Sequence, residues 1–381
     1  MPTRNTLLTF GEPAPWFICR SPIRPDFNFD SVAGRYVVLT FFQSAARADS
    51  RRILDDVMQA RDRFDDANAC FFGVSIDPDD EQLERVSEHI PGIRLFWDFD
   101  ANVSREYGAF LSEQPVAGGG VAGSYRPHTL VLDSLLRVVT VLPFDSNAET
   151  HVARVLQVLD ALPPIGQANL AAVQAPILVV PRVFEPELCR MLIRYYDERG
   201  GEESGFMQER NGMTVAVHDY GHKRRRDQDI EDERLRRSCM VRIHDRLAPV
   251  MHRAFQFRAT RIERYIVACY EGTVGGHFRA HRDNTTKGTA HRRFAVSLHL
   301  NTGEYEGGYV RFPEFGPQLY IAPVGGAVVF SCSLLHEATP VTRGRRYMFL
   351  PFLYDEEAAK IREANRKFLV DDATSPQTSR P

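Results

Sequence analysis

Two continuous apolar runs near the start of the chain predict buried strands. Residues 34–42 (GRYVVLTFF) and 70–77 (CFFGVSID) are rich in β-branched and aromatic side chains. Strands that are buried on both faces of a parallel sheet have this pattern. Residues 50–64, between the two runs, place apolar side chains at helical spacing. The order strand, helix, strand therefore predicts a βαβ unit.

The pattern then changes to a hairpin, a helix and a connecting segment. Residues 128–144 predict a β-hairpin, and residues 148–162 place valine and leucine on one helical face before two prolines. Residues 163–176 are bracketed by prolines and carry little charge, which is typical of an interdomain connection. We therefore expect a first domain over residues 1–162 and a linker over residues 163–176.

The second half begins with helices and continues with short strands. Residues 184–200 predict an amphipathic helix that ends at a glycine pair, and residues 233–255 predict a longer helical region. Beyond Arg261, short apolar segments recur between turns, which is typical of all-β sandwiches and jelly rolls. This pattern places a second domain over residues 177–360 and a polar tail over residues 361–381.

Composition narrows the class of protein. The chain has 381 residues, of which 43% are hydrophobic and 25% charged, as in soluble globular proteins. The 47 basic and 50 acidic residues give a net charge of −3, so no overall field favours nucleic acid or an anionic membrane. No apolar stretch is long enough to span a bilayer and the start lacks a signal-peptide pattern, so we expect a cytoplasmic protein without a membrane partner. The six cysteines form no CxxC pair, so neither a zinc site nor a disulfide scaffold is indicated.

One histidine and one carboxylate are spaced to share a metal ion. His281 and Asp283 form the HxD pair of the chain, and residues two apart on an extended segment project to the same face. His336 follows a later apolar strand and would complete a set of two histidines and one carboxylate. Non-haem iron(II) oxygenases use this facial set. Arg346, ten residues beyond His336, could grip a carboxylate in a bidentate manner.

Each of these residues also has a structural interpretation. Asp283 could cap a turn at Asn284, His336 could be a surface residue at the end of a strand, and Arg346 could pair with Glu337. Three further histidines compete as ligands, but none has an acid two positions later: His277, His291 and His299.

A longer set of motifs surrounds the candidate ligands. The segments are YEGTVGGHFRAHRDN, LNTGEYEGGYVRFPEFG and PVGGAVVFSCSLLHEATPVTRGRRYMFLPF. Over residues 264–354 these segments resemble the catalytic core of prolyl 4-hydroxylase-type 2-oxoglutarate/Fe(II) oxygenases. The resemblance implies a double-stranded β-helix, a jelly-roll and cupin-like core within an α+β domain.

The resemblance also implies roles for individual residues. His281, Asp283 and His336 would bind iron(II), and Arg346 would pair with the distal carboxylate of 2-oxoglutarate. Tyr270 would hydrogen-bond the same co-substrate, and Tyr265 is the alternative because Tyr270 lies eleven residues before His281. Dioxygen would be the second co-substrate, and L-ascorbate is an additional cofactor suggested by the resemblance.

These roles define the leading functional hypothesis. The chain would be a dioxygenase that hydroxylates a protein side chain or a small molecule and releases succinate and CO2. The alternative is a regulatory module that binds oxygen or 2-oxoglutarate and carries a non-catalytic redoxin docking domain. A peroxide-detoxifying redoxin with an appended domain is the weakest of the three hypotheses.

The first half resembles the AhpC/TSA peroxiredoxins of thioredoxin fold over residues 8–145. The segments GEPAPWF, VVLTFF, FFGVSID and RPHTLVLD follow that family's order, and Arg126 matches its later arginine. Ser50 stands where the resemblance places the peroxidatic cysteine, and a serine hydroxyl without an activating base cannot replace a thiolate. We expect a catalytically silent domain that serves docking, homodimerisation or substrate presentation.

A basic run precedes the predicted metal strands. Residues 222–227 (HKRRRD) could be a nucleic-acid patch, but five acidic residues follow between positions 227 and 233. We interpret the run as a solvated loop or helix face whose charges compensate each other. Residues 205–237 are a candidate lid over the substrate.

Overall fold

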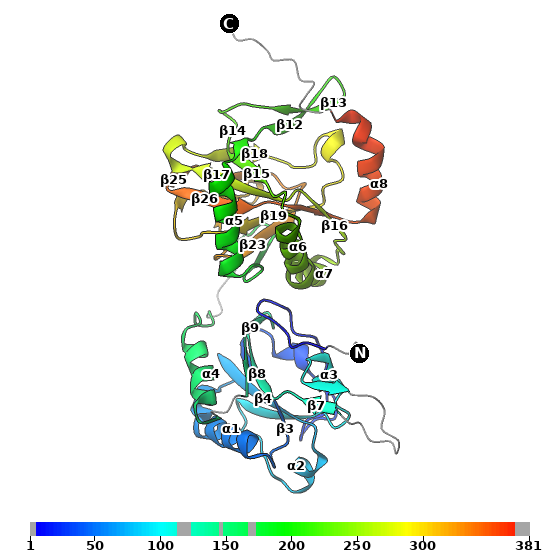
Figure 1. The fold of residues 1–381 in the computed structure, drawn as a ribbon, viewed down its shortest axis with the longest axis vertical. Helices are drawn as coiled ribbons and strands as arrows, with labels where there is room; N and C mark the ends of the chain where they lie inside the picture. The colour runs from blue at the N-terminus through cyan, green and yellow to red at the C-terminus, as the bar shows by residue number, and fades with distance from the viewer. Residues whose placement is uncertain (1–4, 113–122, 145–147, 167–172, 370–381) are drawn as a thin grey trace. The chain divides into compact units, whose positions relative to one another are not determined.

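The computed structural model describes residues 5–112, 123–144, 148–166 and 173–369. The chain divides into two compact units, Met1–Asn169 and Leu170–Pro381, and Figure 1 shows the elements of each. The predicted linker lies partly outside the described residues. No helix in the described ranges combines the length and the apolar character that crossing a bilayer requires.

The first unit contains a five-stranded sheet between helices. Strands β5, β4 and β3 are parallel, and β8 and β9 extend the sheet as an antiparallel hairpin, so the predicted βαβ unit and hairpin are confirmed. This arrangement is thioredoxin-like. The main elements are β3 (Tyr36–Gln43), α1 (Ala48–Gln59), β4 (Ala69–Ser75), α2 (Pro78–Gln82), β5 (Ile93–Trp97), α3 (Asn102–Glu106), β8 (His128–Leu132), β9 (Val138–Pro143) and α4 (His151–Asp160).

The second unit contains a nine-stranded and a five-stranded sheet. In the larger sheet, seven strands follow the order β10-β23-β19-β26-β17-β15-β11. Two further strands extend from it, because β27 pairs with β19 and β16 pairs with β27. The smaller sheet has the order β14-β18-β24-β21-β22. The larger sheet's bounds are β10 (Leu178–Val180), β11 (Glu202–Glu203), β15 (Arg226–Asp229), β16 (Arg261–Glu263), β17 (Ile266–Glu271), β19 (Phe294–His299), β23 (Ala327–Ser331), β26 (Arg345–Phe349) and β27 (Phe352–Tyr354). The smaller sheet's bounds are β14 (Lys223–Arg224), β18 (His277–His281), β21 (Val310–Arg311), β22 (Leu319–Tyr320) and β24 (His336–Ala338).

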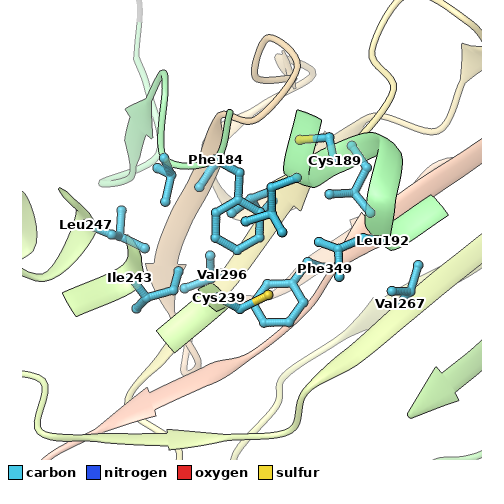
Figure 2. Close-up of a cluster of buried hydrophobic side chains, with 14 of the residues drawn as sticks. Phe184, Cys189, Leu192, Cys239, Ile243, Leu247, Val267, Val296 and Phe349 are labelled. Carbon is cyan, nitrogen blue, oxygen red and sulfur yellow. The ribbon is translucent and has the colours of Figure 1, made fainter. Parts of the chain in front are cut away.

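Three helices cover one face of the larger sheet. Helix α5 (Pro186–Arg199) confirms the predicted amphipathic helix, and α6 (Glu233–Arg242) continues through a π-helical turn into α7 (Ala248–Phe255). Figure 2 shows apolar side chains of these helices gathered against strand residues such as Val296 and Phe349. Burial of these side chains drives the packing of helices on sheet.

Strand alternation sends the other side chains to the opposite face. On β26, Tyr347 and Phe349 belong to the core under the helices, whereas Arg346 is buried on the other side. On β17, Val267 and Cys269 face the helices, and Tyr270 faces away from them. Because side chains alternate along a strand, the helix-covered core fixes which residues line the second face.

The end of the second unit is helical beyond the predicted boundary. Helix α8 (Glu356–Asn365) and a turn to Phe368 occupy positions that we expected to belong to the polar tail, so the predicted start of the tail at residue 361 is wrong. Asp355 caps the helix by accepting a hydrogen bond from the N–H of Ala358, and Asn365 donates to the carbonyl of Lys287. These tertiary contacts hold a polar helix that the sequence pattern did not indicate. Residues 370–381 lie outside the described residues.

Candidate metal centre

Strand pairing brings the three predicted metal ligands together. His281 on β18 lies directly opposite His336 on β24, and their ring centroids are 4.3 Å apart. Asp283 follows β18, where its N–H donates to the carbonyl of Cys332. The Nε2 atom of His281 lies 3.5 Å from one carboxylate oxygen of Asp283, and that of His336 lies 3.3 Å from the other. One ligand atom from each residue lies within 4.8 Å of the others, as a shared metal ion requires.

Both imidazoles are oriented with Nε2 toward the centre. The Nδ1 atom of His281 lies 2.7 Å from the carbonyl of Arg279, and that of His336 lies 3.0 Å from the carbonyl of Leu334. A carbonyl only accepts, so each Nδ1 must carry the proton and donate it. The lone pair of each ring then lies on Nε2, which is the tautomer needed to bind a metal ion.

Burial and mutual contact set the charges of this group. Burial lowers the pKa of His336 to about 4, so its imidazole is neutral at neutral pH. Burial alone would raise the pKa of Asp283, but the adjacent His336 and His281 hold it below its usual value. The site thus offers two imidazoles and one carboxylate, which is the donor set expected for iron(II).

The competing histidines have other partners. His291 bonds Glu263 at 2.7 Å through Nε2, and buried His299 lies 3.1 Å from the hydroxyl of Tyr305. His277 bonds the carbonyl of Gly275. None of the three belongs to the His–Asp–His group that the described residues form.

Arg346 and Tyr270 lie opposite each other on β26 and β17 and line the same cavity as the triad. The Arg346 side chain is only 1% exposed, its Nε has no hydrogen-bond partner among the described residues, and its guanidinium lies 4.9 Å from the Tyr270 ring centre. Glu337, the alternative partner for this arginine, pairs with Arg311 instead. Tyr265 packs against Phe349 on the helix-covered face, so the cavity holds Tyr270 and not its alternative.

A glycine makes room for this arginine. A Cβ on Gly308 would lie 2.6 Å from Cδ of Arg346 and 2.8 Å from Val341, closer than real side chains approach. The residue also has φ +65°, which favours glycine. The glycine pair in the EGGYVRF segment therefore has a packing role behind the site.

The cavity has a volume of about 830 Å³. Some of the residues that line it were expected from the sequence to lie in solvent. Lys223 is 5% and Arg225 is 6% exposed, so the interpretation of the HKRRRD run as a solvated face is wrong for these two residues. Lys223 begins β14, Arg225 lies between β14 and β15, and both are buried, whereas Arg226 between Arg225 and Asp227 is exposed. Alternation of polar residues on a strand was the signal that could have shown this.

The candidate lid has a defined structure. Strands β12 (Phe206–Arg210) and β13 (Met213–Val217) form a hairpin, and residues of both strands line the cavity. Phe206 packs against His222, which in turn lies near His281. The hairpin therefore forms part of the cavity wall.

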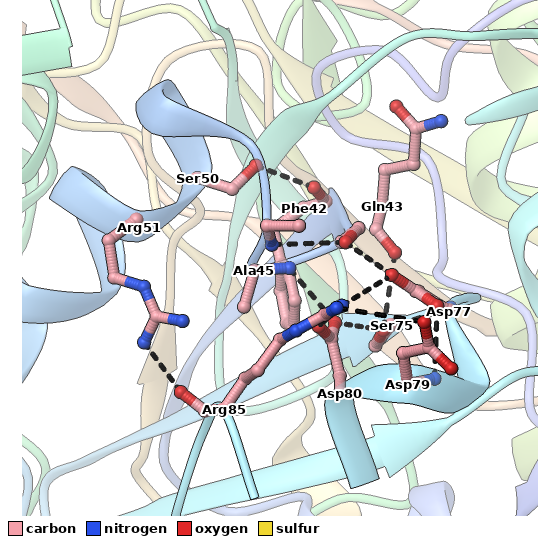
Figure 3. A network of polar contacts seen from close by, with 12 residues as sticks. Phe42, Gln43, Ala45, Ser50, Arg51, Ser75, Asp77, Asp79, Asp80 and Arg85 are labelled. Carbon is pink, nitrogen blue, oxygen red and sulfur yellow. Dashed lines mark hydrogen bonds and ion pairs between the residues drawn. The ribbon is translucent and has the colours of Figure 1, made fainter. Parts of the chain in front are cut away.

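The first unit has no thiolate at the position that resembles a peroxidatic site. Ser50 is fully buried, and its hydroxyl donates to the carbonyl of Phe42 at 2.7 Å. Figure 3 shows the adjoining loop bound to Asp77 and Asp80, with Arg85 between these carboxylates.

The remaining candidates in this unit are also unsuited to peroxide chemistry. Burial raises the pKa of the Cys19 and Cys70 thiols to about 12, so neither forms a thiolate at neutral pH. The side chain of Arg126 is exposed.

Comparisons with known proteins separate along the same two units. Residues 10–141 match the AhpC/TSA family, and residues 265–354 match the 2OG-Fe(II) oxygenase superfamily. A PKHD-type hydroxylase of Pseudomonas fluorescens is 38% identical over 90 residues, which are 22% of this chain and 39% of the relative. The chain thus spans well under half the length of the curated relatives it matches.

Two solved structures cover one unit each. A Pseudomonas putida prolyl-4-hydroxylase covers 48% of this chain and 94% of its own, with 17% identity and a TM-score of 0.37. The peroxidoxin BcpB of Mycobacterium tuberculosis covers 41% of this chain and 99% of its own, with 18% identity and a TM-score of 0.34. By its matches to the two families, the chain carries an AhpC/TSA-type region in its N-terminal half and a 2OG-Fe(II) oxygenase region in its C-terminal half.

Proposed function

We propose that this protein is a 2-oxoglutarate- and Fe(II)-dependent dioxygenase that hydroxylates a protein side chain or a small molecule. The observation that carries the proposal is the convergence of the triad of His281, Asp283 and His336 with the buried Arg346 in one cavity. The Nε atom of Arg346 has no hydrogen-bond partner in the part of the chain that the structure describes. This reaction class requires a metal centre and a cation that binds the carboxylate of the co-substrate.

The three triad residues would hold the iron. Their two imidazoles and one carboxylate would leave coordination positions free for other ligands. When bound, iron(II) supplies the chemistry that couples decarboxylation of 2-oxoglutarate, with release of succinate and CO2, to oxidation of a substrate C–H bond. The carbonyl contacts of the two Nδ1 atoms fix the rings before the metal arrives.

Arg346 and Tyr270 would hold the co-substrate. A carboxylate would satisfy the guanidinium of Arg346, whose burial excludes water that would compete for the same hydrogen bonds. The Tyr270 hydroxyl accepts a hydrogen bond from Arg225 at 3.4 Å, so its own proton remains available for an acceptor in the cavity. Ascorbate stays a prediction from the resemblance.

We also infer that the two sheets of the second unit form a double-stranded β-helix. Side chains of both sheets line the one cavity, and the triad lies on the smaller sheet while Arg346 lies on the larger. In such a core the metal ligands and the co-substrate cation come from facing sheets.

For the first unit we propose a non-catalytic role in docking, homodimerisation or substrate presentation. The support is the buried hydroxyl of Ser50 and the absence of a low-pKa thiol among the described residues. The full chain should show no thiol-dependent peroxide turnover. Turnover that depends on Cys19 or Cys70 would contradict this role.

The test of the proposed function is a pair of measurements on the full chain. Under nitrogen, Fe(II) and 2-oxoglutarate should bind together in wild-type protein, and in air a substrate screen should give succinate in step with a hydroxylated product. Binding without succinate release from any substrate would favour the regulatory module. Failure to bind the metal would overturn both hypotheses.

A further inference from the structure

The cavity wall contains more buried positive charge than the proposed co-substrate accounts for. Lys223 and Arg225 are almost fully buried, and Arg264 lines the same cavity beside them. Asp227 is the acid that contacts this group: it accepts from Arg225 at 2.6 Å and from Arg264 at 3.1 Å. We call these four residues the cation cluster.

The contacts inside the cation cluster leave its charge unbalanced. Arg225, Arg264 and the Ser204 hydroxyl all donate to the same Oδ2 atom of Asp227. Lys223 donates to Ser204 and to the carbonyl of Gly205, both of which are neutral. Three cations therefore face one carboxylate. The Nε atom of Arg225 is buried without a hydrogen-bond partner among the described residues.

The neighbouring groups do not supply the missing negative charge. Glu263 is bound to Arg292 and His291. Asp283 belongs to the triad, where iron(II), this carboxylate, a 2-oxoglutarate dianion and Arg346 would sum to no net charge.

The acids at the mouth of the cavity are exposed and screened by solvent: Glu202, Glu203, Glu209 and Asp229. These exposed acids therefore do not balance the excess positive charge of the cation cluster. Burial and the nearby Arg225 lower the pKa of Lys223, so an anion bound beside this side chain would favour its charged form.

The cation cluster is also placed where a substrate would lie. Lys223 pairs with Phe278 across β14 and β18, and its ammonium lies 4.9 Å from the Phe278 ring, which stacks on His281 at 3.5 Å. Arg225 reaches the hydroxyl of Tyr270 on the other side. The cluster thus lies between the triad and the co-substrate residues, in the same cavity.

We propose that Lys223 and Arg225 bind an anionic group, a carboxylate or a phosphate, of the molecule that is oxidised. This inference rests on the proposed function and names the substrate class for the same site. A buried cation without a counter-ion costs free energy, and an anion that enters the cavity would remove that cost while gaining charge-assisted hydrogen bonds. A neutral analogue of the substrate brings no negative charge, so it would not remove that cost.

The test uses Mn(II) in place of iron, with saturating 2-oxoglutarate under nitrogen. Inorganic phosphate is followed by phosphorus NMR and carbon-13-labelled acetate by carbon NMR, because a paramagnetic metal broadens only nearby nuclei. The variants are R225Q and K223Q, and R226Q is the matched control because Arg226 directly follows Arg225 in the chain and is exposed. Hydrogen exchange of peptides from β17 and β26 verifies that the second unit of each variant is folded, and calorimetry measures its binding of metal and 2-oxoglutarate.

Wild-type protein and R226Q should broaden the signal of at least one anion, and the anion that responds tells a carboxylate site from a phosphate site. R225Q and K223Q should each bind that anion roughly tenfold more weakly, because each loses a charge-assisted contact. Equal broadening in all four proteins would mean an anion bound directly to the metal and would overturn the inference.

The remaining outcomes separate the inference from the proposed function. No broadening in any protein that binds Mn(II) and 2-oxoglutarate would overturn the inference alone. Failure of wild-type protein to bind Mn(II) would overturn the proposed function and this inference with it.

Discussion

Replacing Arg346 by methionine should remove co-substrate binding while leaving the second unit about as stable as before. Buried arginines normally stabilise a fold through partners, but the Nε of this guanidinium has no hydrogen-bond partner among the described residues, and none of their carboxylates forms an ion pair with it. Methionine keeps a long apolar stem in the same space. The substitution therefore separates a binding role from a structural one.

The magnitude follows from two opposing effects. Loss of a buried, unsatisfied polar group relieves a cost of about 1–3 kcal/mol. Loss of the contact between Arg346 and the Tyr270 ring, 4.9 Å away, costs about 0.5–2 kcal/mol. Together these ranges place the net change in the free energy of unfolding between a loss of about 1 kcal/mol and a gain of about 2.5 kcal/mol. By contrast, 2-oxoglutarate at 100 times its Kd should stabilise wild-type protein by about 2.7 kcal/mol and R346M by almost nothing.

The distribution of tryptophan makes this measurable in the full chain. Trp16 and Trp97 are the two tryptophans, and both lie in the first unit. Tryptophan fluorescence therefore reports the first unit and should not change in R346M. Hydrogen exchange of peptides from β17 and β26 reports the second unit, with and without Mn(II) and 2-oxoglutarate.

Two results would refute this reasoning. A loss of more than about 2 kcal/mol in the ligand-free second unit would show that Arg346 has a stabilising partner. An unchanged response to 2-oxoglutarate in R346M would show that the co-substrate carboxylate binds elsewhere.

Four further substitutions test other parts of the structure. His281→Ala should abolish stoichiometric Mn(II) binding by calorimetry, because it removes one of three ligands, and retained binding would argue against the triad. Gly308→Ala should weaken 2-oxoglutarate binding but not metal binding, because the new Cβ would displace the arginine behind the site, and equal loss of both would contradict this. Asp227→Asn should destabilise the second unit by about 3–5 kcal/mol in hydrogen exchange, because it leaves buried cations without their acid, whereas exposed Asp229→Asn should change it by less than about 0.5 kcal/mol. Burial lowers the pKa of His128 from 6.5 to about 4, so the unfolded chain binds a proton there that the folded chain does not, and stability should fall as pH drops from about 6.5 to 4. His128→Phe should reduce that fall in the first unit by about 3 kcal/mol in urea titrations followed by tryptophan fluorescence, and an unchanged slope would contradict the assignment.

The sequence by itself determined the elements that depend on local pattern. The apolar runs of the first unit, the hairpin at residues 128–144 and helix α5 follow from hydrophobic period and turn residues, which act over a few positions. The spacing of His281 and Asp283 placed both on one face of an extended segment for the same reason. His336 was proposed because it follows an apolar strand and completes the ligand set, and Arg346 because it lies ten residues later, but no local rule places either residue beside His281.

Only the tertiary structure decided which polar side chains are buried and what they face. The acidic residues after the HKRRRD run suggested compensation in solvent, yet Lys223 and Arg225 are buried at the cavity. Strand β14, which begins at Lys223, pairs with β18, and β15, which follows Arg225, pairs with β17. The choice of Tyr270 over Tyr265 depended on which face of β17 the helices cover. Burial and charge balance result from contacts between distant segments, so a pattern that acts over a few residues cannot fix them.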